Sequence, residues 1–538
     1  MYRSIRRTRR DVLRSGASGA VLGAGALIAP SFIRPGRARA QDALKDGAIG
    51  GPTGFEGAEA YQYGPDSPEG RAIEALRAMV GAGNAPTTIR LALSEGSIGQ
   101  LTSPFPEGAS SIKELFEAES GITLDIIGVP SGQEFTKAVQ DISTGGGTYD
   151  IYTVDFNRLG DIAETGGVVN LNDFVEKHRP EWSAENGYVG GEQGVSLLNK
   201  YRGDFYGVSL DGDFLTWIYR TDLFEDDAMA SAHQEATGRA LEPPRTYAEL
   251  DETARFFTQH TNGEIFGCTD LRNQGWGYIN WYGRYTTTGN PNRFLFADDG
   301  TILINSEEGV LATREYVDSL SYHAPDAISW SWPEQYGSMA AGNTAMTCAW
   351  SNMPKFLDNP GNEGSQVVGK LGSWAPPGRV VEGDLISRSL LWFSLAAAVS
   401  EQAENPEACY LFLQWLGGPQ ISSWMVANPA GYFDPWQNAH LDDPLVARSY
   451  HDYHVETIRE SIRRAVPSIN YPGATAFHNA LDENLVAALT GERTPEEAME
   501  RTEREWQRIA RRIGEEKLQE AIALGNAAWP TVTDPVPS

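Results

Sequence analysis

Two hydrophobic patterns alternate along the chain from residue 88 onward. Short apolar runs predict β-strands, and apolar residues that recur every three or four positions predict amphipathic helices. Strands are expected at residues 88–93, 123–129, 150–154, 205–209, 344–349 and 390–397. Helices are expected at residues 112–119, 132–142, 158–165, 247–257, 307–322, 336–341 and 406–416. Strands and helices in alternation, joined by short glycine turns, favour an α/β fold with parallel sheets.

The two ends of this region differ from its middle. Residues 474–489 and 495–513 predict long helices with Glu and Arg at helical spacing. Residues 41–86 are rich in glycine and proline, and they predict one helix at about residues 67–80, with Ser67 as its N-cap. We interpret residues 41–87 as an N-terminal extension that packs on the main body.

The first 40 residues have the organisation of a leader. A basic segment with the pair Arg9 and Arg10 precedes an apolar stretch at residues 17–29, and Ala38-Arg39-Ala40 follows. This order predicts a twin-arginine-type signal peptide that is cleaved after about Ala40, which would place the mature protein in the periplasm. The alternative is a basic N-terminal arm on a cytoplasmic protein.

The length of the chain indicates how many domains it has, and its charge argues against two classes of binding partner. A chain of 538 residues exceeds what one hydrophobic core supports, so at least two domains are expected. Its net charge is −29 although the leader is strongly basic, so the remainder is more acidic still. Such a surface repels phosphate backbones and anionic lipids, which argues against nucleic acid and membrane partners. After the leader, no apolar run is long enough to span a bilayer.

Motifs for covalent or cofactor chemistry are missing from the sequence. Cys268, Cys348 and Cys409 stand far apart without the spacing of a metal site, and they are expected to be buried thiols or to form one disulfide. The chain has no nucleophile elbow, phosphate-binding loop or dinucleotide fingerprint. We therefore predict no catalytic residue, no metal and no cofactor.

Polar and aromatic side chains follow several predicted strands. Asp155 and Arg158 follow the strand at 150–154, Asp213 follows the strand at 205–209, and Trp350 follows the strand at 344–349. Ligands of open α/β sheets bind at the carboxyl ends of strands. Trp rings stack on the C–H faces of sugars, and Asp and Arg bind hydroxyl groups. The alternative for each residue is a core position for the Trp, or a helix cap for the Asp.

Six segments, in this order, resemble the extracellular solute-binding proteins of family 1, the sugar-binding subunits of ABC importers related to the maltodextrin-binding protein. The likeness lies in EAESGI, in GTYDIYTVD, in FYGV and the later YRTDLF, in PPRTYAEL, in AAGNTAM and the following Trp350, and in EACYLFLQWL. It covers about residues 88–515. The extension before residue 88 is not part of the family's common pattern.

The resemblance implies a two-lobed periplasmic-binding-protein fold of type II, with a hinge between the lobes. Lobe 1 would take residues 88–211 and 394–440, and lobe 2 would take residues 214–392 and 445–525. The chain would cross between lobes near residues 210–213 and 391–393, and residues 526–538 would form a C-terminal tail.

The resemblance also implies ligand-binding positions. Asp155, Arg158, Asp213 and Trp350 fall at positions that resemble ligand contacts in the family. Trp276, Arg388 and Tyr432 are added as further candidates for substrate binding.

The function implied is a periplasmic receptor, not an enzyme, that captures a sugar, oligosaccharide or polyol and delivers it to the permease subunits of an ABC transporter. We expect it to act as a monomer. One alternative is a binding protein for a non-sugar solute such as a polyamine, with the carboxylates as ligands. A more remote alternative is a periplasmic glycosidase, because carboxylates are abundant.

Overall fold

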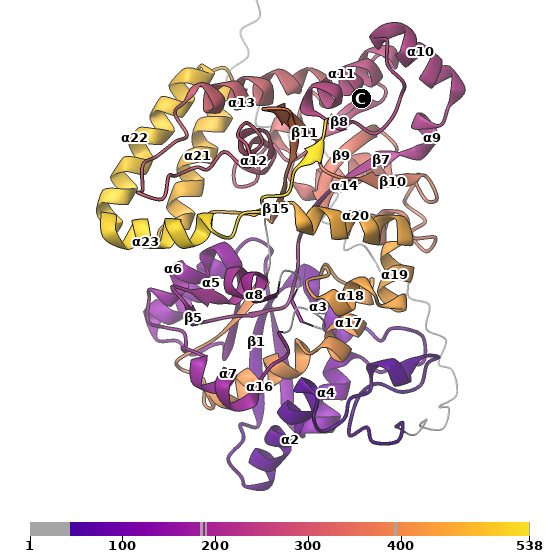
Figure 1. Cartoon of the computed structure of the whole chain (residues 1–538). Coiled ribbons are helices and arrows are strands. Elements are labelled where there is room, and N and C mark those ends of the chain that lie inside the picture. Colours follow the sequence, from indigo (N-terminus) through magenta and orange to yellow (C-terminus); the bar gives the residue numbers. More distant parts are fainter. Residues whose placement is uncertain (1–43, 183–186, 189–190, 392–394, 537–538) are drawn as a thin grey trace, which may run out of the picture. The chain divides into compact units, whose positions relative to one another are not determined.

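The computed structural model describes residues 44–182, 187–188, 191–391 and 395–536. Residues Gln41–Ser538 form one compact unit (Figure 1). The predicted signal peptide lies outside the described residues, and so do residues 392–394 at the second predicted crossing.

The first sheet contains five strands in the order β2-β1-β3-β14-β6. The strands are β1 (Thr88–Ser94), β2 (Thr123–Val129), β3 (Ile151–Asp155), β6 (Val208–Ser209) and β14 (Leu395–Val399). β1, β2 and β3 are parallel, so their carboxyl ends share one edge. β14 is antiparallel to both β3 and β6, and Leu395 pairs with Asp155. A segment from late in the chain therefore completes the interior of this sheet.

Helices cover the first sheet and supply most of its core. They are α2 (Pro68–Gly81), α4 (Ile112–Ser120), α5 (Glu134–Thr144), α6 (Leu159–Ala163), α16 (Pro406–Leu416) and α17 (Pro419–Ala427). Phe116 of α4 contacts Phe412 and Trp415 of α16, with ring centroids 4.7 and 5.2 Å apart. Helix α2 of the N-terminal extension buries Ile73 and Leu76 in the same core. The extension is thus an integral layer of the first sheet's core.

The second sheet contains four strands in the order β10-β7-β9-β8. They are β7 (Leu215–Arg220), β8 (Phe266–Thr269), β9 (Thr344–Trp350) and β10 (Leu371–Trp374). β9 is antiparallel to β7 and parallel to β8, and all of its side chains are buried. This mixed α/β architecture has the predicted fold class.

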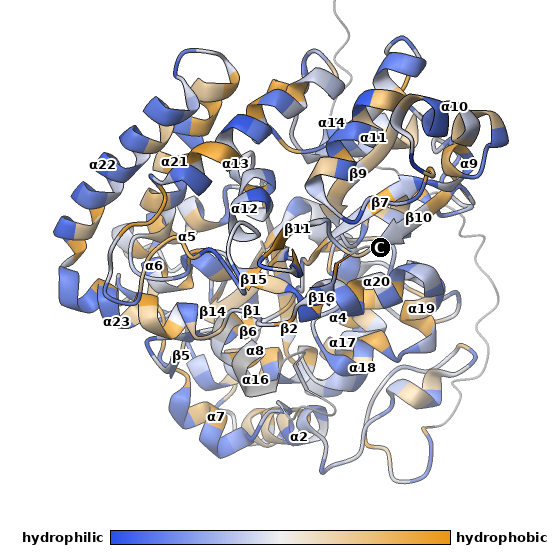
Figure 2. Ribbon diagram, turned by 45° about the horizontal axis from the view of Figure 1, so that its top comes forward, coloured by the Kyte–Doolittle hydropathy of each residue, from blue (hydrophilic) through white to orange (hydrophobic). Residues whose placement is uncertain are grey.

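The helices around the second sheet come from two parts of the chain. They are α10 (Asp227–Thr237), α11 (Tyr247–His260), α12 (Tyr278–Thr286), α13 (Glu307–Asp318), α14 (Trp332–Ala340), α20 (Asp452–Arg463), α21 (Ala474–Leu489), α22 (Pro495–Ile513) and α23 (Glu515–Asn526). Helix α11 begins with the expected capping box, in which Thr246 and Glu249 each bind the other's backbone N–H. Helix α22 carries hydrophilic and hydrophobic residues in turn (Figure 2), and it buries Met499, Trp506 and Ile509 on one face.

Shorter elements complete the description. They are α3 (Ile98–Thr102), α7 (Asn172–His178), α8 (Gly191–Asn199), α9 (Thr221–Phe224), α15 (Met353–Leu357), α18 (Asn438–Leu441), α19 (Pro444–Tyr450), β4 (Lys200–Tyr201), β5 (Asp204–Phe205), β11 (Gly378–Val381), β12 (Asp384–Ser387), β13 (Ser389–Leu391), β15 (Ala465–Pro467) and β16 (Asp534–Pro535). Single 3-10 turns lie at Ala58–Tyr61, Glu95–Ser97, Phe156–Arg158, Ser319–Tyr322 and Ala327–Ser329.

Several predicted elements differ from the structure, and three of them have a clear physical reason. The strand expected at 390–397 is two strands, since β13 pairs with β15 whereas β14 belongs to the first sheet. The strand expected at 205–209 is interrupted, because the N–H groups of Tyr206 and Gly207 donate to the Asn199 carbonyl instead of to a neighbouring strand. The helix expected from residue 132 begins at Glu134, because Gly132 has a φ of 81°.

Among the helices that begin after a glycine without a side-chain cap are α12, α17 and α21. In each case a carboxylate from another helix accepts hydrogen bonds from the backbone at the start of the helix. Asp482 accepts from Gly275 and Tyr278 at α12, Glu69 accepts from Gln420 at α17, and Asp161 accepts from Gly473 and Thr475 at α21. These remote caps satisfy N–H groups that a helix end leaves without partners.

Candidate functional site

Asp155 and Arg158 lie at the carboxyl edge of the first sheet. Asp155 ends β3, and Arg158 ends the 3-10 turn that leads into α6. The Arg158 Nε atom is 3.3 Å from the Asp155 Oδ2 atom, and the guanidinium group lies 5.3 Å from the centroid of the Phe135 ring. Burial raises the pKa of Asp155 to about 6, although Arg158 favours its charged form. At neutral pH this pair offers a charged acceptor and a half-buried charged donor.

Asp213 and Trp350 lie where the chain enters the second sheet. Trp350 ends β9 opposite Leu215, the first residue of β7, and the Ser351 N–H donates to the Phe214 carbonyl at 3.0 Å. Asp213 has a φ of 28°, a backbone conformation that costs energy for a residue with a Cβ atom. The indole rings of Trp276 and Trp350 meet edge to face, with centroids 5.3 Å apart.

Tyr432 belongs to a loop after α17 and contacts residues near the first sheet and near the second. Its ring contacts Trp332 and Phe356, each with centroids 5.2 Å apart, and it lies directly over Gly96. A Cβ atom at Gly96 would lie 2.2 Å from this ring, so the contact requires glycine. The Asn352 side-chain amide donates to the Tyr432 carbonyl at 2.9 Å.

Neighbouring groups connect six of the seven predicted residues, since Asp155 and Arg158 act on Tyr278 near Trp276, and Asp213 lies beside Asp434, whose partner Asn352 also binds Tyr432. We call this set the strand-end cluster: Asp155, Arg158, Asp213, Trp276, Trp350 and Tyr432. Its two sides are linked electrostatically. The charge of Asp155 contributes to raising the pKa of Asp213, although burial is the main cause. Burial and, to a lesser extent, the nearby Arg158 charge lower the pKa of His478 on α21 to about 3. Arg158 of the first sheet therefore lies near a helix of the second.

Arg388 is placed elsewhere, although the sequence suggested it for ligand binding. It is buried between β12 and β13, and its guanidinium group donates to Asn292 at 2.5 Å and to the carbonyls of Pro291 and Val532 at 2.7 and 2.9 Å. Loss of solvent lowers its pKa to about 10. The structure thus gives Arg388 partners in the C-terminal tail and does not join it to the strand-end cluster.

A second set of carboxylates lies beside the cluster. Asp211, Asp213 and Asp434 place oxygens within 4.8 Å of one another, and all three are buried. The backbone N–H of Asp434 donates to Asp211 at 2.6 Å, and Tyr450 and Asn352 donate to the Asp434 carboxylate at 2.9 and 3.0 Å. Burial raises the pKa of each carboxyl group, and mutual repulsion raises those of Asp211 and Asp213 further.

Lys355 provides a positive charge beside Asp211, Asp213 and Asp434. Its ammonium group is buried and donates to the Phe433 carbonyl at 3.1 Å, and burial lowers its pKa to about 8 against the opposing effect of Asp434. Lys355 balances part of the charge of these carboxylates, and their raised pKa values favour the neutral carboxyl forms, so these groups form an internal network and we assign them no ion.

Several neighbours of the cluster were not predicted. Glu134 is a neighbour whose charge raises the pKa of Asp155, and burial raises its own pKa. Glu134 follows β2, so a search for polar residues after the carboxyl end of each predicted strand would have found it. Asn352, Lys355 and Asp434 lie in loops or short helices far apart in sequence, and no local pattern marks them.

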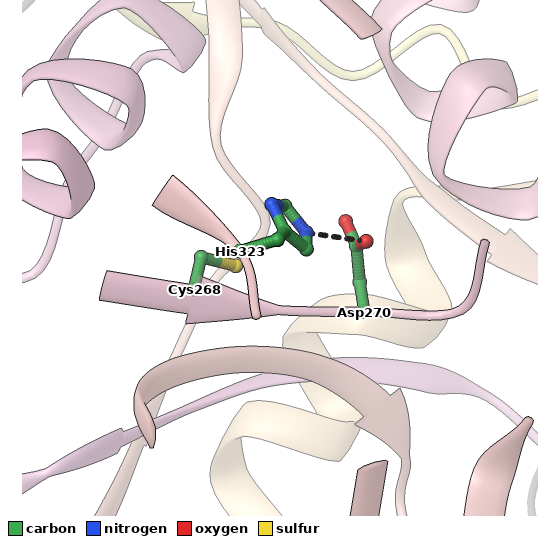
Figure 3. Close-up of side chains that lie close together, drawn as sticks. All are labelled: Cys268, Asp270 and His323. Carbon is green, nitrogen blue, oxygen red and sulfur yellow. Dashed lines mark hydrogen bonds and ion pairs between the residues drawn. The ribbon is translucent and has the colours of Figure 1, made fainter. Parts of the chain in front are cut away.

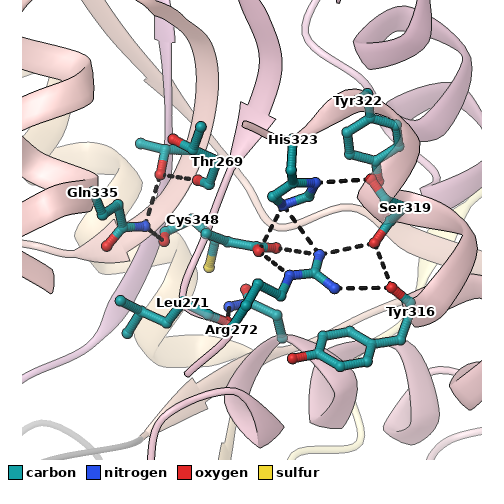
Figure 4. A network of polar contacts seen from close by, with 12 residues as sticks. Thr269, Leu271, Arg272, Tyr316, Ser319, Tyr322, His323, Gln335 and Cys348 are labelled. Carbon is teal, nitrogen blue, oxygen red and sulfur yellow. Dashed lines mark hydrogen bonds and ion pairs between the residues drawn. The ribbon is translucent and has the colours of Figure 1, made fainter. Parts of the chain in front are cut away.

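A separate polar network lies in the second sheet's core. Cys268, Asp270 and His323 lie close together there (Figure 3). The His323 Nε2 atom is 2.8 Å from Asp270, and Nδ1 is 2.8 Å from the Ser319 carbonyl. Arg272 forms a two-point ion pair with Asp270 and donates to Ser319 at 2.8 Å (Figure 4). This guanidinium group holds the pKa of Asp270 below its usual range despite burial. Because Arg272 already neutralises Asp270, the donor set does not fit a metal ion.

The family model for the bacterial extracellular solute-binding proteins matches residues 99–421, which is more than half of the chain. The chain belongs to this family. The residues of the strand-end cluster up to Trp350 all fall within the matched range. Family members are binding proteins rather than enzymes.

Two relatives of this solute-binding protein are distant in sequence. An "Erythritol/L-threitol-binding protein" of Mycolicibacterium smegmatis is 21% identical over 371 residues, which cover 66% of this chain and 74% of the relative. A "Probable amino-acid ABC transporter periplasmic-binding protein" of Sinorhizobium fredii is 20% identical over 321 residues, which cover 59% of this chain and 67% of the relative.

A solved structure shares the fold. The ABC transporter solute-binding protein of Agrobacterium radiobacter, crystallised with ribitol, has a TM-score of 0.64 at 20% identity, and the match covers 79% of this chain and 98% of that one. The solute-binding protein therefore has the two-lobed fold of periplasmic binding proteins. None of the helices in the described part of the chain has the length and apolar character needed to cross a membrane.

Proposed function

We propose that this chain is a periplasmic receptor that binds a sugar or polyol at the strand-end cluster and delivers it to the permease subunits of an ABC transporter. The proposal is carried by two pairs and the link between them: Asp155 and Arg158 pair at the edge of the first sheet, and Trp276 and Trp350 pack together in the second. Besides burial, the charges of Asp155 and Arg158 both act on the pKa of Tyr278, two residues after Trp276. A ligand bound there would touch both lobes, and its binding would favour their closure.

The chemistry of the cluster suits a neutral, polyhydroxylated ligand. Asp155 accepts hydrogen bonds from hydroxyl groups, and Arg158, whose side chain is 31% exposed, retains donors for hydroxyl oxygens. Trp276 is half-buried and offers an aromatic surface for C–H groups. The buried Asn157 side-chain oxygen, which has no hydrogen-bond partner among the described residues, is a further acceptor beside Arg158.

The internal charge balance supports a neutral ligand over a polyamine. Asp155 is paired with Arg158, and the neighbouring carboxylates share Lys355. A dication would have to compete with these built-in cations for the same carboxylates. The relatives point the same way, because two of the three described above are named for, or crystallised with, polyols. No covalent step forms part of this proposal.

The proposal extends to location and assembly. The N-terminal segment would be a twin-arginine-type signal peptide, removed after about Ala40, and the receptor would act as a monomer in the periplasm. The acidic net charge supports a freely diffusing protein without nucleic acid or anionic membrane partners.

The test is calorimetric titration of the mature chain with ribitol, erythritol, mannitol, maltose, spermidine and an amino-acid mixture. We expect saturable binding of at least one sugar or polyol, and Trp276→Ala should weaken it about 30-fold through loss of aromatic stacking worth about 2 kcal/mol. The control is Trp374→Phe, which changes a tryptophan whose indole N–H donates to the Pro244 carbonyl at 2.8 Å. Binding of spermidine alone, or of the amino acids alone, would overturn the carbohydrate assignment.

A further inference from the structure

Helix α21 lacks a cap of its own at its N-terminus. Gly473 occupies the N-cap position with a φ of 81° and contributes no side-chain hydrogen bond. The first turn of the helix belongs to the core around the second sheet, where Ala474 and Phe477 are fully buried. The N–H groups of this turn therefore need an acceptor from outside the helix.

Asp161 on α6 supplies this acceptor from the first sheet's side. Its Oδ1 atom accepts from the Gly473 N–H at 3.0 Å, and its Oδ2 atom accepts from the Thr475 hydroxyl at 2.8 Å and from the Thr475 N–H at 3.3 Å. Helix α6 follows β3 after one 3-10 turn, and its residues Leu159 and Ile162 are buried beside that strand. One carboxylate thus joins an element of the first sheet to an element of the second.

Ion pairs flank this contact on the same two surfaces. Glu164 at the end of α6 accepts from Lys517 of α23 at 2.5 Å and from the Tyr201 hydroxyl at 2.7 Å. Arg202 lies 3.6 Å from Glu520 of α23. Figure 1 shows α6 beside α23, with α21 next to it. Hydrogen bonds and ion pairs therefore join the first sheet's side to helices α21 and α23. Among the described residues of this interface, Asp161 makes three of these hydrogen bonds.

The interface between α6 and α21 lies only a few residues along the chain from the strand-end cluster. Arg158 lies three residues before Asp161, in the 3-10 turn that continues into α6. On the other side, His478, whose pKa the Arg158 charge lowers, lies one turn after Thr475. A movement of α6 away from α21 would carry Arg158 with it, because the intervening turn is continuous.

We propose that Asp161 is a positioning residue that holds the two lobes in the closed arrangement by capping α21. It touches no ligand and acts on the equilibrium between open and closed forms. Opening would expose the α21 N-terminus and remove a carboxylate from the positive end of its helix dipole. Ligand affinity depends on the closed population, so loss of this cap lowers affinity in proportion to the fall in that population.

The experiment measures closure and affinity separately on the mature chain. Spin labels are placed at exposed positions of α5 and α22, and the inter-label distance is followed by pulsed EPR without ligand and with ribitol or maltose. Asp161→Ala should shift the distance distribution toward the longer, open state and weaken binding about tenfold, mainly through faster dissociation. Asp161→Asn keeps an acceptor oxygen and should restore most of the closed population. Asp173→Ala, which removes an exposed carboxylate from the first turn of α7, should match the unaltered chain.

Only the affinity readout rests on the proposed function. If no sugar or polyol binds, the distance measurement still decides the role of Asp161. An Asp161→Ala chain that unfolds at a lower temperature but keeps the unaltered distance distribution would overturn the proposal, since the cap would then be structural alone. Equal distance distributions for the Ala and Asn variants and the unaltered chain would also overturn it.

Discussion

Glu69 offers the sharpest test of how the N-terminal extension is held. Its carboxylate is fully buried between the first turns of α2 and α17, and it accepts from the Gln420 N–H at 2.8 Å. Burial raises the pKa of Glu69 to about 7 from 4.5, although hydrogen bonds from the α2 and α17 backbones favour its charged form. The folded chain therefore holds the Glu69 proton more tightly than the unfolded chain does.

The magnitude follows from this difference in pKa. Because the folded-state pKa is the higher one, the free energy of unfolding falls as the pH rises from 4.5 to 7, by about 3 kcal/mol in total. Below pH 4.5 both states are protonated, and above pH 7 both are ionised, so the contribution of Glu69 is constant there. Glu69→Gln does not titrate and should lack this decline.

The assay is urea denaturation of the two chains from pH 4.5 to pH 8. Between these limits, the stability of Glu69→Gln relative to the unaltered chain should rise by about 3 kcal/mol. Any loss of hydrogen bonding in the variant is the same at each pH and leaves this slope unchanged. Glu74→Gln, at an exposed position of the same helix, is the control and should show no such change. A stability difference that does not vary with pH would refute the reasoning.

Two further predictions concern regions outside the strand-end cluster. Arg388→Met should lower the free energy of unfolding by about 3 kcal/mol, because the carbonyls of Pro291 and of Val532 in the C-terminal tail lose their donor. Ligand affinity measured by calorimetry should change less than about twofold, and a large loss of affinity without loss of stability would restore Arg388 to the binding site. Replacing Arg9 and Arg10 together by Lys should leave the precursor in the cytoplasm, as measured by fractionation and immunoblotting. Normal export of that variant would contradict the twin-arginine assignment and leave the receptor assignment intact.

The sequence predicted elements best where periodicity and a capping signal agreed. The strand expected at 88–93 is β1, and the helix expected at 247–257 is α11, which begins at the predicted cap Thr246. The hydrophobic pattern failed at 390–397, where one predicted strand is two strands of different sheets and no change in hydrophobicity separates them. A crossing near residues 391–393 was expected only from the family resemblance.

The candidate site was predictable only in part. Asp155 and Asp213 follow strands, so the geometry of parallel sheets places them at one edge. Lys355 and Asp434 lie outside any strand, and their proximity depends on how loops from distant parts of the chain fold together. Arg388 is the opposite case, a polar residue after a strand that does not join the cluster. It binds the Val532 carbonyl in the C-terminal tail, and the sequence of this tail has no periodic pattern that would have predicted the contact.

The position of β14 inside the first sheet has a consequence for synthesis. β6 pairs in that sheet only with β14 among the described strands, and β14 begins at Leu395. While a ribosome makes the chain, the sheet edge at β3 therefore stays open until about three quarters of the residues have emerged. Contacts of such large sequence separation slow folding and prolong exposure of apolar surface. A nascent chain of this kind needs shelter from aggregation until β14 has emerged and paired, and a route that carries finished, folded proteins across the membrane would suit it.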